Sequence, residues 1–147
     1  MKKISIIMMF VALFATTSCS SLTGASDTAA MTTGTTCARA LIALRASHKA
    51  GTLSITNLSD LSNMLVVVNA YNSLKTNKAN SNYKKSFSTG MVAGGSGIIT
   101  NSNVATIVNL LLNANGLANV NSNNISTGSN STTVTNSIVP MIECMKQ

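Results

Sequence analysis

The stretch TNLSDLSNMLVVVNAYNSLKTNK, residues 56–78, decides the fold class of this chain. Its apolar residues recur every three or four positions, which is the spacing of one face of an α-helix. Asn57 precedes them as a candidate N-cap, because its side chain can accept a hydrogen bond from a free backbone N–H group. The run of Val66 to Val68 alone could be a buried strand, but the helical spacing on both sides favours a central helix with a broad apolar face. That face comprises Leu58, Leu61, Leu65 and Val68 beside Met64, Val67, Tyr71 and Leu74.

The segment before this stretch, CARALIALRASHKAG at residues 37–51, has the same periodicity. Its apolar stripe includes one histidine, and the residues between the stripe positions are rich in alanine, a strong helix former. Gly51 is a typical stop signal after a helix. We therefore predict an amphipathic helix that ends at Gly51. The stripe consists of Cys37, Leu41, Leu44 and His48.

Three segments further along also favour helices. The first begins near Asn82, the second is NSNVATIVNLLLNANG at residues 101–116 with Gly116 as its stop, and the third contains Pro140, which must either begin or kink it. Residues 117–132 lose this periodicity and predict a long loop or an irregular hairpin. The apolar stripes are Tyr83, Phe87 and Met91; Val104, Ile107, Val108, Leu111 and Leu112; and Val134, Ile138, Met141, Ile142 and Met145. The chain is thus predicted to be all-α, a small helical bundle of about four to five helices.

A glycine-rich run, STGMVAGGSGIIT, follows the predicted third helix. Gly90 and Gly94 are four residues apart, a spacing that lets a second helix approach closely. No lysine follows Gly95, so the run does not match a phosphate-binding loop. We favour a tight turn or a close helix crossing inside the bundle, with a membrane-active segment as the alternative.

The N-terminus, MKKISIIMMFVALFATTSCSSL, has the organisation of a secretory signal. Lys2 and Lys3 precede an apolar core at residues 4–15, and a short run of small polar residues ends on Cys19. The apolar core is too short to span a bilayer as a helix. Residues 1–18 are therefore interpreted as a targeting signal rather than as part of the fold.

The position of the cysteine makes this signal resemble the type II signal of bacterial lipoproteins. Ser18 fits that pattern, whereas Thr16 stands where the family has an aliphatic residue. The resemblance implies that Cys19 receives diacylglycerol and becomes the first residue of a mature chain anchored to the cell envelope by acyl chains such as palmitate. Ser20 replaces the aspartate that commonly retains lipoproteins at the inner membrane, which favours the outer membrane. The alternatives are an ordinary secretory signal with Cys19 as a stray thiol, or an uncleaved anchor.

The stretch after Cys19, SSLTGASDTAAMTTGTT, contains only two bulky apolar residues, Leu22 and Met31. Such a composition predicts a flexible tether over residues 19–36 and a folded domain over residues 37–147. Within it, Asp27, Thr28 and Ala29 resemble the acceptor site that one bacterial phylum uses for O-glycosylation, a match that chance explains at least as well.

Charge is sparse in this chain and argues against nucleic acid as a partner. The formal net charge is +7, but charged residues make up only 9% of the chain, and none occurs from Ser86 through Ile142. Nucleic-acid binders of this size concentrate Lys and Arg on one face and interleave aromatic residues. The remaining polarity comes from Asn, Ser and Thr, which predicts an uncharged hydrogen-bonding surface.

The supply of catalytic groups is equally small. The chain has three acids and one histidine, His48, and a general acid/base pair needs two such groups held together. The spacing of Cys and His predicts no zinc site, and no nucleophile elbow occurs. We therefore expect no enzymatic activity, no cofactor and no metal, with His48 as a packed or half-exposed residue.

Two function classes remain open. The first is a non-catalytic envelope lipoprotein, a structural or interaction module that presents its uncharged surface to a protein or glycan. The second is a lipid-anchored binding protein that holds a small apolar or lipidic ligand between helices, in a cavity lined by Met64, Val68, Ile107 and Leu111. A tightly filled core would favour the first class and an open cavity the second.

Two cysteines remain once Cys19 carries lipid. Cys37 and Cys144 lie on the first and last predicted helices, in a compartment where thiols are oxidised. We predict a disulfide between them that would join the two ends of the domain, with two separate buried thiols as the alternative.

Overall fold

The computed structural model describes residues 22–120 and 131–145. Within these ranges the chain forms five α-helices, one 3-10 helix and no strand, which confirms the predicted all-α bundle. The helices are α2 (Leu22–Lys49), α3 (Leu58–Thr76), α4 (Ser81–Gly94), α5 (Val104–Leu112) and α7 (Ser131–Glu143), with the 3-10 helix η1 (Asn115–Asn119) after α5. The predicted signal segment at residues 1–18 and Cys19 lie outside the described residues.

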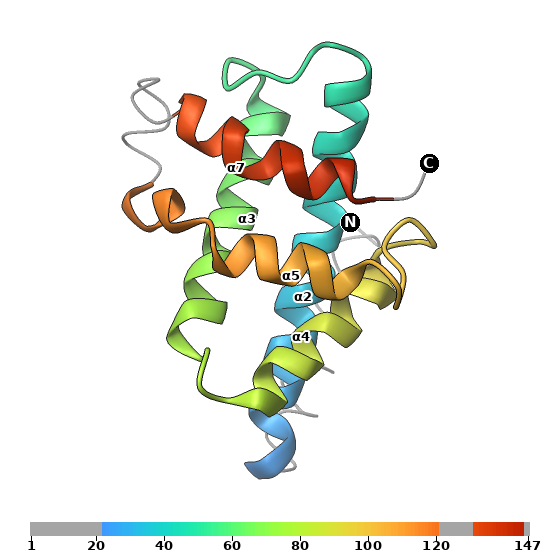
Figure 1. Ribbon diagram of the computed structural model, residues 1–147, viewed down its shortest axis with the longest axis vertical. Coiled ribbons are helices and arrows are strands. Elements are labelled where there is room, and N and C mark those ends of the chain that lie inside the picture. Colours follow the sequence, from blue (N-terminus) through green and yellow to red (C-terminus); the bar gives the residue numbers. More distant parts are fainter. Residues whose placement is uncertain (1–21, 121–130, 146–147) are drawn as a thin grey trace, which may run out of the picture.

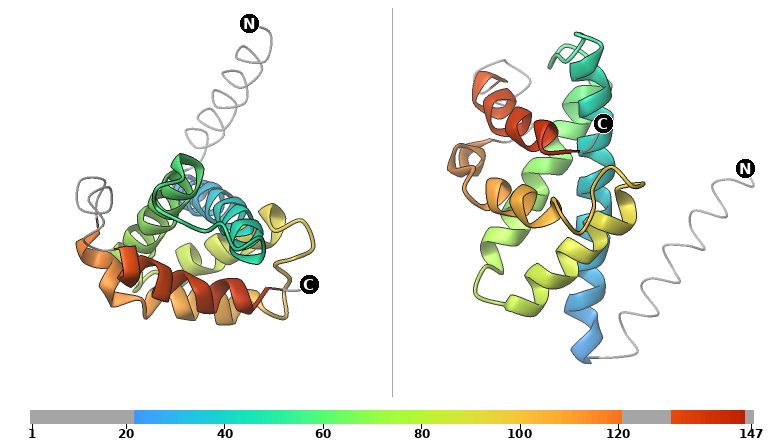
Figure 2. Two further views of the ribbon diagram at one scale, coloured as in Figure 1. Left: turned by 90° about the horizontal axis from the view of Figure 1, so that it is seen from above. Right: turned by 45° about the vertical axis from the view of Figure 1, so that its right-hand side comes forward.

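The helices form two layers (Figures 1 and 2). The 28-residue α2 and the neighbouring α3 run along the long axis of the molecule. Helices α5 and α7 lie across them on one side, and α4 packs diagonally against α2. Among the described residues, no helix combines the length and apolarity needed to cross a bilayer.

The core is built from the predicted apolar stripes of all five helices. On α3, the buried stripe is the one that contains Met64, Tyr71 and Leu74, whereas Leu58 on the neighbouring stripe is 76% exposed. The other large buried side chains include Leu41, Leu44, Phe87, Met91, Ile107, Leu111, Ile138 and Met141. The helical periodicity of these stripes is therefore confirmed, and only the width of the apolar face of α3 was overestimated.

A polar connection joins the end of α2 to the start of α3. The side chain of Asn57 caps α3, as predicted, by accepting hydrogen bonds from the backbone N–H groups of Ser59 (2.9 Å) and Asp60 (3.4 Å). The carboxylate of Asp60 is only 1% exposed and accepts from the Ser47 hydroxyl (2.6 Å) and the Ser54 N–H (3.1 Å). This buried carboxylate therefore fixes the loop between the two helices.

The prediction of a flexible tether is wrong for residues 22–36, which form the first half of α2. Two glycines explain why this stretch is ordered without bulky apolar residues. A Cβ atom at Gly34 would overlap the carbonyl oxygen of Phe87 on α4, and one at Gly90 would overlap the carbonyl oxygen of Met31 on α2. The two backbones therefore pack directly against each other, which a count of bulky side chains does not detect.

The same crossing confirms the predicted role of the glycine-rich run. A Cβ at Gly94 would lie 2.6 Å from the carbonyl oxygen of Thr35. The Thr35 hydroxyl lies 2.9 Å from the carbonyl oxygen of Met31 and 3.0 Å from that of Gly90, so it shares a hydrogen bond between the two helices. Gly97 follows in the turn after α4 with a φ of +82°, a conformation that glycine adopts without strain.

The last helix, α7, begins at Ser131 and continues through Pro140. Proline therefore lies inside this helix rather than at its start. Beyond Glu143, the carbonyl oxygen of Cys144 accepts a hydrogen bond from the Asn103 side chain (3.2 Å), which ties the C-terminal end of α7 to the start of α5. Residues 121–130, most of the predicted loop, lie outside the described residues.

Candidate functional site

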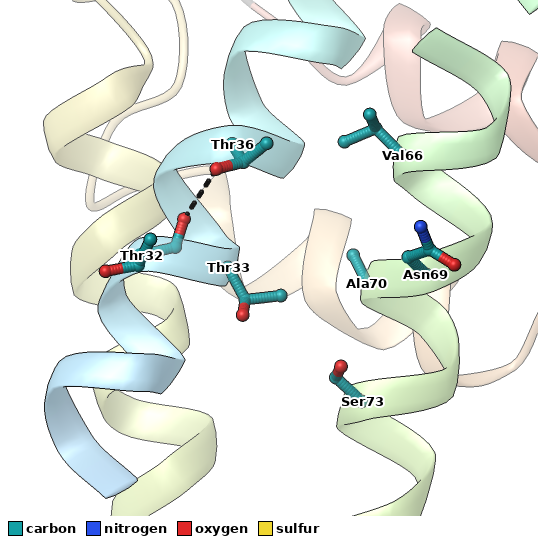
Figure 3. Close-up of a pocket in the computed structure, with 7 residues that line it drawn as sticks. All are labelled: Thr32, Thr33, Thr36, Val66, Asn69, Ala70 and Ser73. Atoms are coloured by element: carbon teal, nitrogen blue, oxygen red, sulfur yellow. Dashed lines mark hydrogen bonds between the residues drawn. The ribbon is translucent and has the colours of Figure 1, made fainter. Parts of the chain in front are cut away.

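A surface groove of about 240 Å³ lies between α2 and α3 and opens to solvent (Figure 3). Its position follows from the spacing of the residues along each helix, because residues three or four apart fall on one face. None of the lining residues is charged. They are Thr32, Thr33 and Thr36 from α2, and Val66, Asn69, Ala70 and Ser73 from α3.

The two walls of the groove differ in chemistry. The α2 wall carries threonine hydroxyls, and Figure 3 shows Thr33 directed toward Ala70 on the facing helix. On the α3 side, Val66 and Ala70 form the apolar floor of the groove, and Asn69 and Ser73 contribute polar groups. The small side chain of Ala70 is buried and leaves room above it.

The hydrogen bonds of the threonines determine what the groove can offer a ligand. Each hydroxyl donates to a carbonyl oxygen one turn earlier in α2: Thr32 to Thr28 (3.0 Å), Thr33 to Ala29 (2.9 Å) and Thr36 to Thr32 (2.8 Å). Because the hydroxyl protons are used within the helix, the oxygen lone pairs remain as acceptors.

Asn69 adds amide donors and an acceptor at the exposed rim of the groove. The groove thus suits a neutral ligand with hydroxyl or amide groups. Its volume is below the range of about 300–1,000 Å³ typical of drug-sized ligand pockets. It is suited to one sugar ring or one side chain of a larger partner.

The four residues predicted to line a ligand cavity lie elsewhere. Met64 and Val68 on α3 and Ile107 and Leu111 on α5 are all at most 3% exposed and belong to one hydrophobic cluster. None of them lines the groove between α2 and α3. The structure brings these four side chains together as packed core.

The predicted disulfide between Cys37 and Cys144 is wrong, because both thiols are free. Helix α7 does neighbour α2, but its C-terminal part lies beside the far end of α2, where a pocket of about 140 Å³ is lined by Arg45 and Lys49 together with Ile142. Cys37 lies two helical turns before Arg45, about 12 Å along the axis.

The environments of the two thiols also differ. Cys37 is fully buried, and this burial raises the pKa of its thiol from 9.0 to about 12, because a thiolate is poorly solvated in an apolar core. Cys144 is half-buried after the end of α7.

The smaller pocket also holds the chain's histidine. His48 is exposed at the end of α2, in a pocket that Glu143 of α7 also lines. The prediction of a packed or half-exposed histidine therefore underestimates its exposure. In the part of the chain that the structure describes, no group of three or more His, Cys, Asp or Glu side chains could hold a metal ion.

Sequence reasoning missed the groove because it assigned Thr32, Thr33 and Thr36 to the tether. A usable signal was nevertheless present. Thr28, Thr32 and Thr36 repeat every four residues, and a threonine hydroxyl can bond to the carbonyl oxygen four residues earlier in a helix. Thr28 itself lies half-buried within α2.

No model of a protein family matches this chain, and neither the curated proteins nor the solved structures include a match. The functional assignment therefore rests on the residues and geometry described above.

Proposed function

We propose that this protein is a non-catalytic lipoprotein of the bacterial cell envelope, anchored through Cys19, that serves as a structural or interaction module. The observation that carries the proposal is the order of the N-terminal residues. Lys2 and Lys3, a short apolar core and a small polar run lead directly to a cysteine. Two or three acyl chains on Cys19 would anchor the chain durably, whereas one chain gives only marginal binding.

The start of α2 adds a spatial constraint to this proposal. Helix α2 begins at Leu22, so a chain of three residues spans at most about 11 Å between the Cα atoms of Cys19 and Leu22. A lipid on Cys19 would therefore hold the helical domain close to the membrane surface rather than at the end of a long tether.

The uncharged groove between α2 and α3 is the surface we propose for the interaction. Its hydroxyl acceptors, the Asn69 amide and its apolar floor suit a neutral polar partner, an envelope protein or a glycan. The buried acid, Asp60, supports a non-catalytic role because its carboxylate is engaged by Ser47 and Ser54.

Mass spectrometry of the native protein tests the anchor. The N-terminal peptide should begin at Cys19 and carry the mass of its acyl chains, and Cys19→Ala should release the protein from the membrane fraction. Cys144→Ala is the matched control and should stay anchored, because it removes a cysteine from the other end of the chain. An unmodified peptide that spans Ser18 and Cys19 in the mature protein would refute the proposal.

The proposed location is the outer membrane, because Ser20 follows the cysteine. Separation of the two membranes by density should place the native protein in the outer-membrane fraction. Ser20→Asp should move it to the inner-membrane fraction, whereas Ser21→Asp, one residue later, should not. Equal distribution of all three proteins would contradict the assignment.

A photoreactive side chain at Asn69 tests the groove. We expect it to yield a discrete adduct in intact envelopes, because Asn69 lines the groove. The same group at Asn72 is the control, since this exposed residue of α3 does not line the groove. The same adduct from both positions, or none from Asn69, would contradict a role for the groove.

A further inference from the structure

Four lysines gather at one end of the molecule. Lys75 lies in the last turn of α3, Lys78 in the turn that follows, and Lys84 and Lys85 near the start of α4. Lys84 is half-buried and the other three are exposed. The Nζ atom of Lys75 donates to the Tyr71 hydroxyl (3.0 Å) and lies 5.4 Å from the centre of the Tyr71 ring, which holds this lysine in place.

This basic end, defined by Lys75, Lys78, Lys84 and Lys85, coincides with the start of α2. Helix α4 runs in the same direction as α2, because Gly90 meets Met31 and Gly94 meets Thr35 one turn later in both helices. The first turns of α4 therefore lie beside the first turns of α2.

Helix α3 runs in the opposite direction. Along the groove, Val66 lies at the level of Thr36, and Ser73 lies toward the N-terminal end of α2 (Figure 3). Figures 1 and 2 show the resulting arrangement, with the α3–α4 turn and the start of α2 at the same end of the molecule.

The acids of the chain are distributed differently. Asp60 bonds to Ser47, and Glu143 lines a pocket with His48, so both acids lie at the far end of α2. In the sequence, Asp27 is the acid that belongs to the first turns of α2. Four lysines against one acid leave the basic end clearly positive.

We propose that the basic end contacts the anionic phospholipid headgroups of the membrane into which the Cys19 lipid inserts. This inference rests on the proposed lipid anchor, because Cys19 precedes α2 by only three residues and its acyl chains would enter the bilayer beside these lysines. Lysines near an anionic surface strengthen binding by about fivefold each. The lysines thus supply the second membrane signal and orient the domain.

This orientation sets the distance of the groove from the membrane surface. With the start of α2 at the membrane, Thr32 to Thr36 lie about 15–20 Å further along the helix axis. The groove would then be presented above the headgroup layer, where a partner in the same compartment can reach it.

The test uses the mature chain, residues 19–147, as the Cys19→Ala variant, so that binding reports the lysines without any acyl chain. Its binding is measured by co-sedimentation with vesicles of phosphatidylcholine alone or of equal parts phosphatidylcholine and phosphatidylglycerol. We expect binding only to the anionic vesicles and its loss in 0.5 M salt, because salt screens these charges.

Two further double variants distinguish binding through the basic end from binding through net charge alone. Lys78→Gln with Lys85→Gln should weaken binding to the anionic vesicles by about 25-fold. Arg39→Gln with Lys49→Gln removes the same charge from exposed positions away from the basic end and should change binding by less than about twofold. Unchanged helical circular dichroism in both variants verifies the fold.

Equal weakening by both pairs, or equal binding to neutral vesicles, would overturn the inference while leaving the anchor intact. An unacylated Cys19 in the native protein would instead overturn the proposed function, whatever the vesicles show. The two failures are therefore distinguishable.

Discussion

The α2–α4 crossing and the contacts of α5 hold the same bundle together by opposite means. At the crossing, Gly34 and Gly90 let one backbone touch the other without intervening side chains. On α5, by contrast, Ile107 and Leu111 are fully buried among the side chains of the core. The comparison shows that helices can pack through the absence of side chains as well as through large ones. Removing side-chain volume should therefore destabilise the α5 contacts, whereas adding volume should destabilise the α2–α4 crossing.

The largest effect should come from removing volume on the α5 side. Leu111→Ala leaves a cavity in the packed core and should lower the free energy of unfolding by about 3–4 kcal/mol. Leu110→Ala is the matched control, because Leu110 is only partly buried on the same helix and should lose about 1 kcal/mol. Urea denaturation measures both, and equal losses would show that the α5 face is loosely packed.

Adding volume at the crossing should have the next largest effect. In an open helix, Gly→Ala is stabilising by up to about 1 kcal/mol, because alanine has the higher helix propensity. At Gly90 the added Cβ would overlap the backbone of Met31, so Gly90→Ala should instead destabilise by about 2–3 kcal/mol. Ala93→Leu adds volume at an exposed position of α4 and should change stability by less than about 0.5 kcal/mol. Stabilisation by Gly90→Ala would refute direct backbone contact.

A third kind of contact, a hydrogen bond to a buried carboxylate, joins α2 to α3. Asp60→Ala would leave the Ser47 hydroxyl and the Ser54 N–H without their buried acceptor. Both donors are partly buried, so leaving them unpaired makes this substitution destabilising by about 1–2 kcal/mol. Ser59→Ala, at the exposed neighbouring residue, should be close to neutral. If the two variants unfold at the same urea concentration, the carboxylate does not stabilise the loop.

The same comparison explains how far the sequence could predict the structure. The bulky stripes of α4, α5 and α7, the stripe of α3 that contains Met64 and Tyr71, and the Asn57 cap are confirmed. They follow from periodicity and capping preference. The first half of α2 was missed because it is ordered by small buried residues. Gly34 packs directly against the backbone of α4, and Ala30 is fully buried, but a count of large apolar residues includes neither of them. The groove was missed with it, because its α2 wall lies in that same half.

The disulfide prediction failed for a related reason. Cys37 and Cys144 frame the domain in sequence, but the crossing point of α2 and α7 depends on how the intervening helices pack. Apolar periodicity predicts which helices exist, but it does not predict the point along each helix axis at which two of them cross.

The smallest of the expected effects is a pH dependence at Cys37, which lies in the core beside the missed half of α2. Burial raises the pKa of this thiol from 9.0 to about 12. Below pH 9 the thiol is protonated in the folded and unfolded states alike, so the free energy of unfolding is unaffected. Above pH 9 only the unfolded state releases the proton, and stability therefore falls with rising pH until the folded thiol also ionises near pH 12.

At pH 10 this linkage should lower the free energy of unfolding by about 1 kcal/mol relative to pH 8. Urea denaturation of the parent protein and of Cys37→Ala at both pH values isolates the effect, because other titrating groups are common to both. Cys37→Ala removes the ionisable thiol and should lose about 1 kcal/mol less between the two pH values, whereas Cys144→Ala keeps Cys37 and should match the parent. An identical loss in the parent and in Cys37→Ala would mean that solvent reaches the Cys37 thiol in the folded protein, and would contradict its burial in the core.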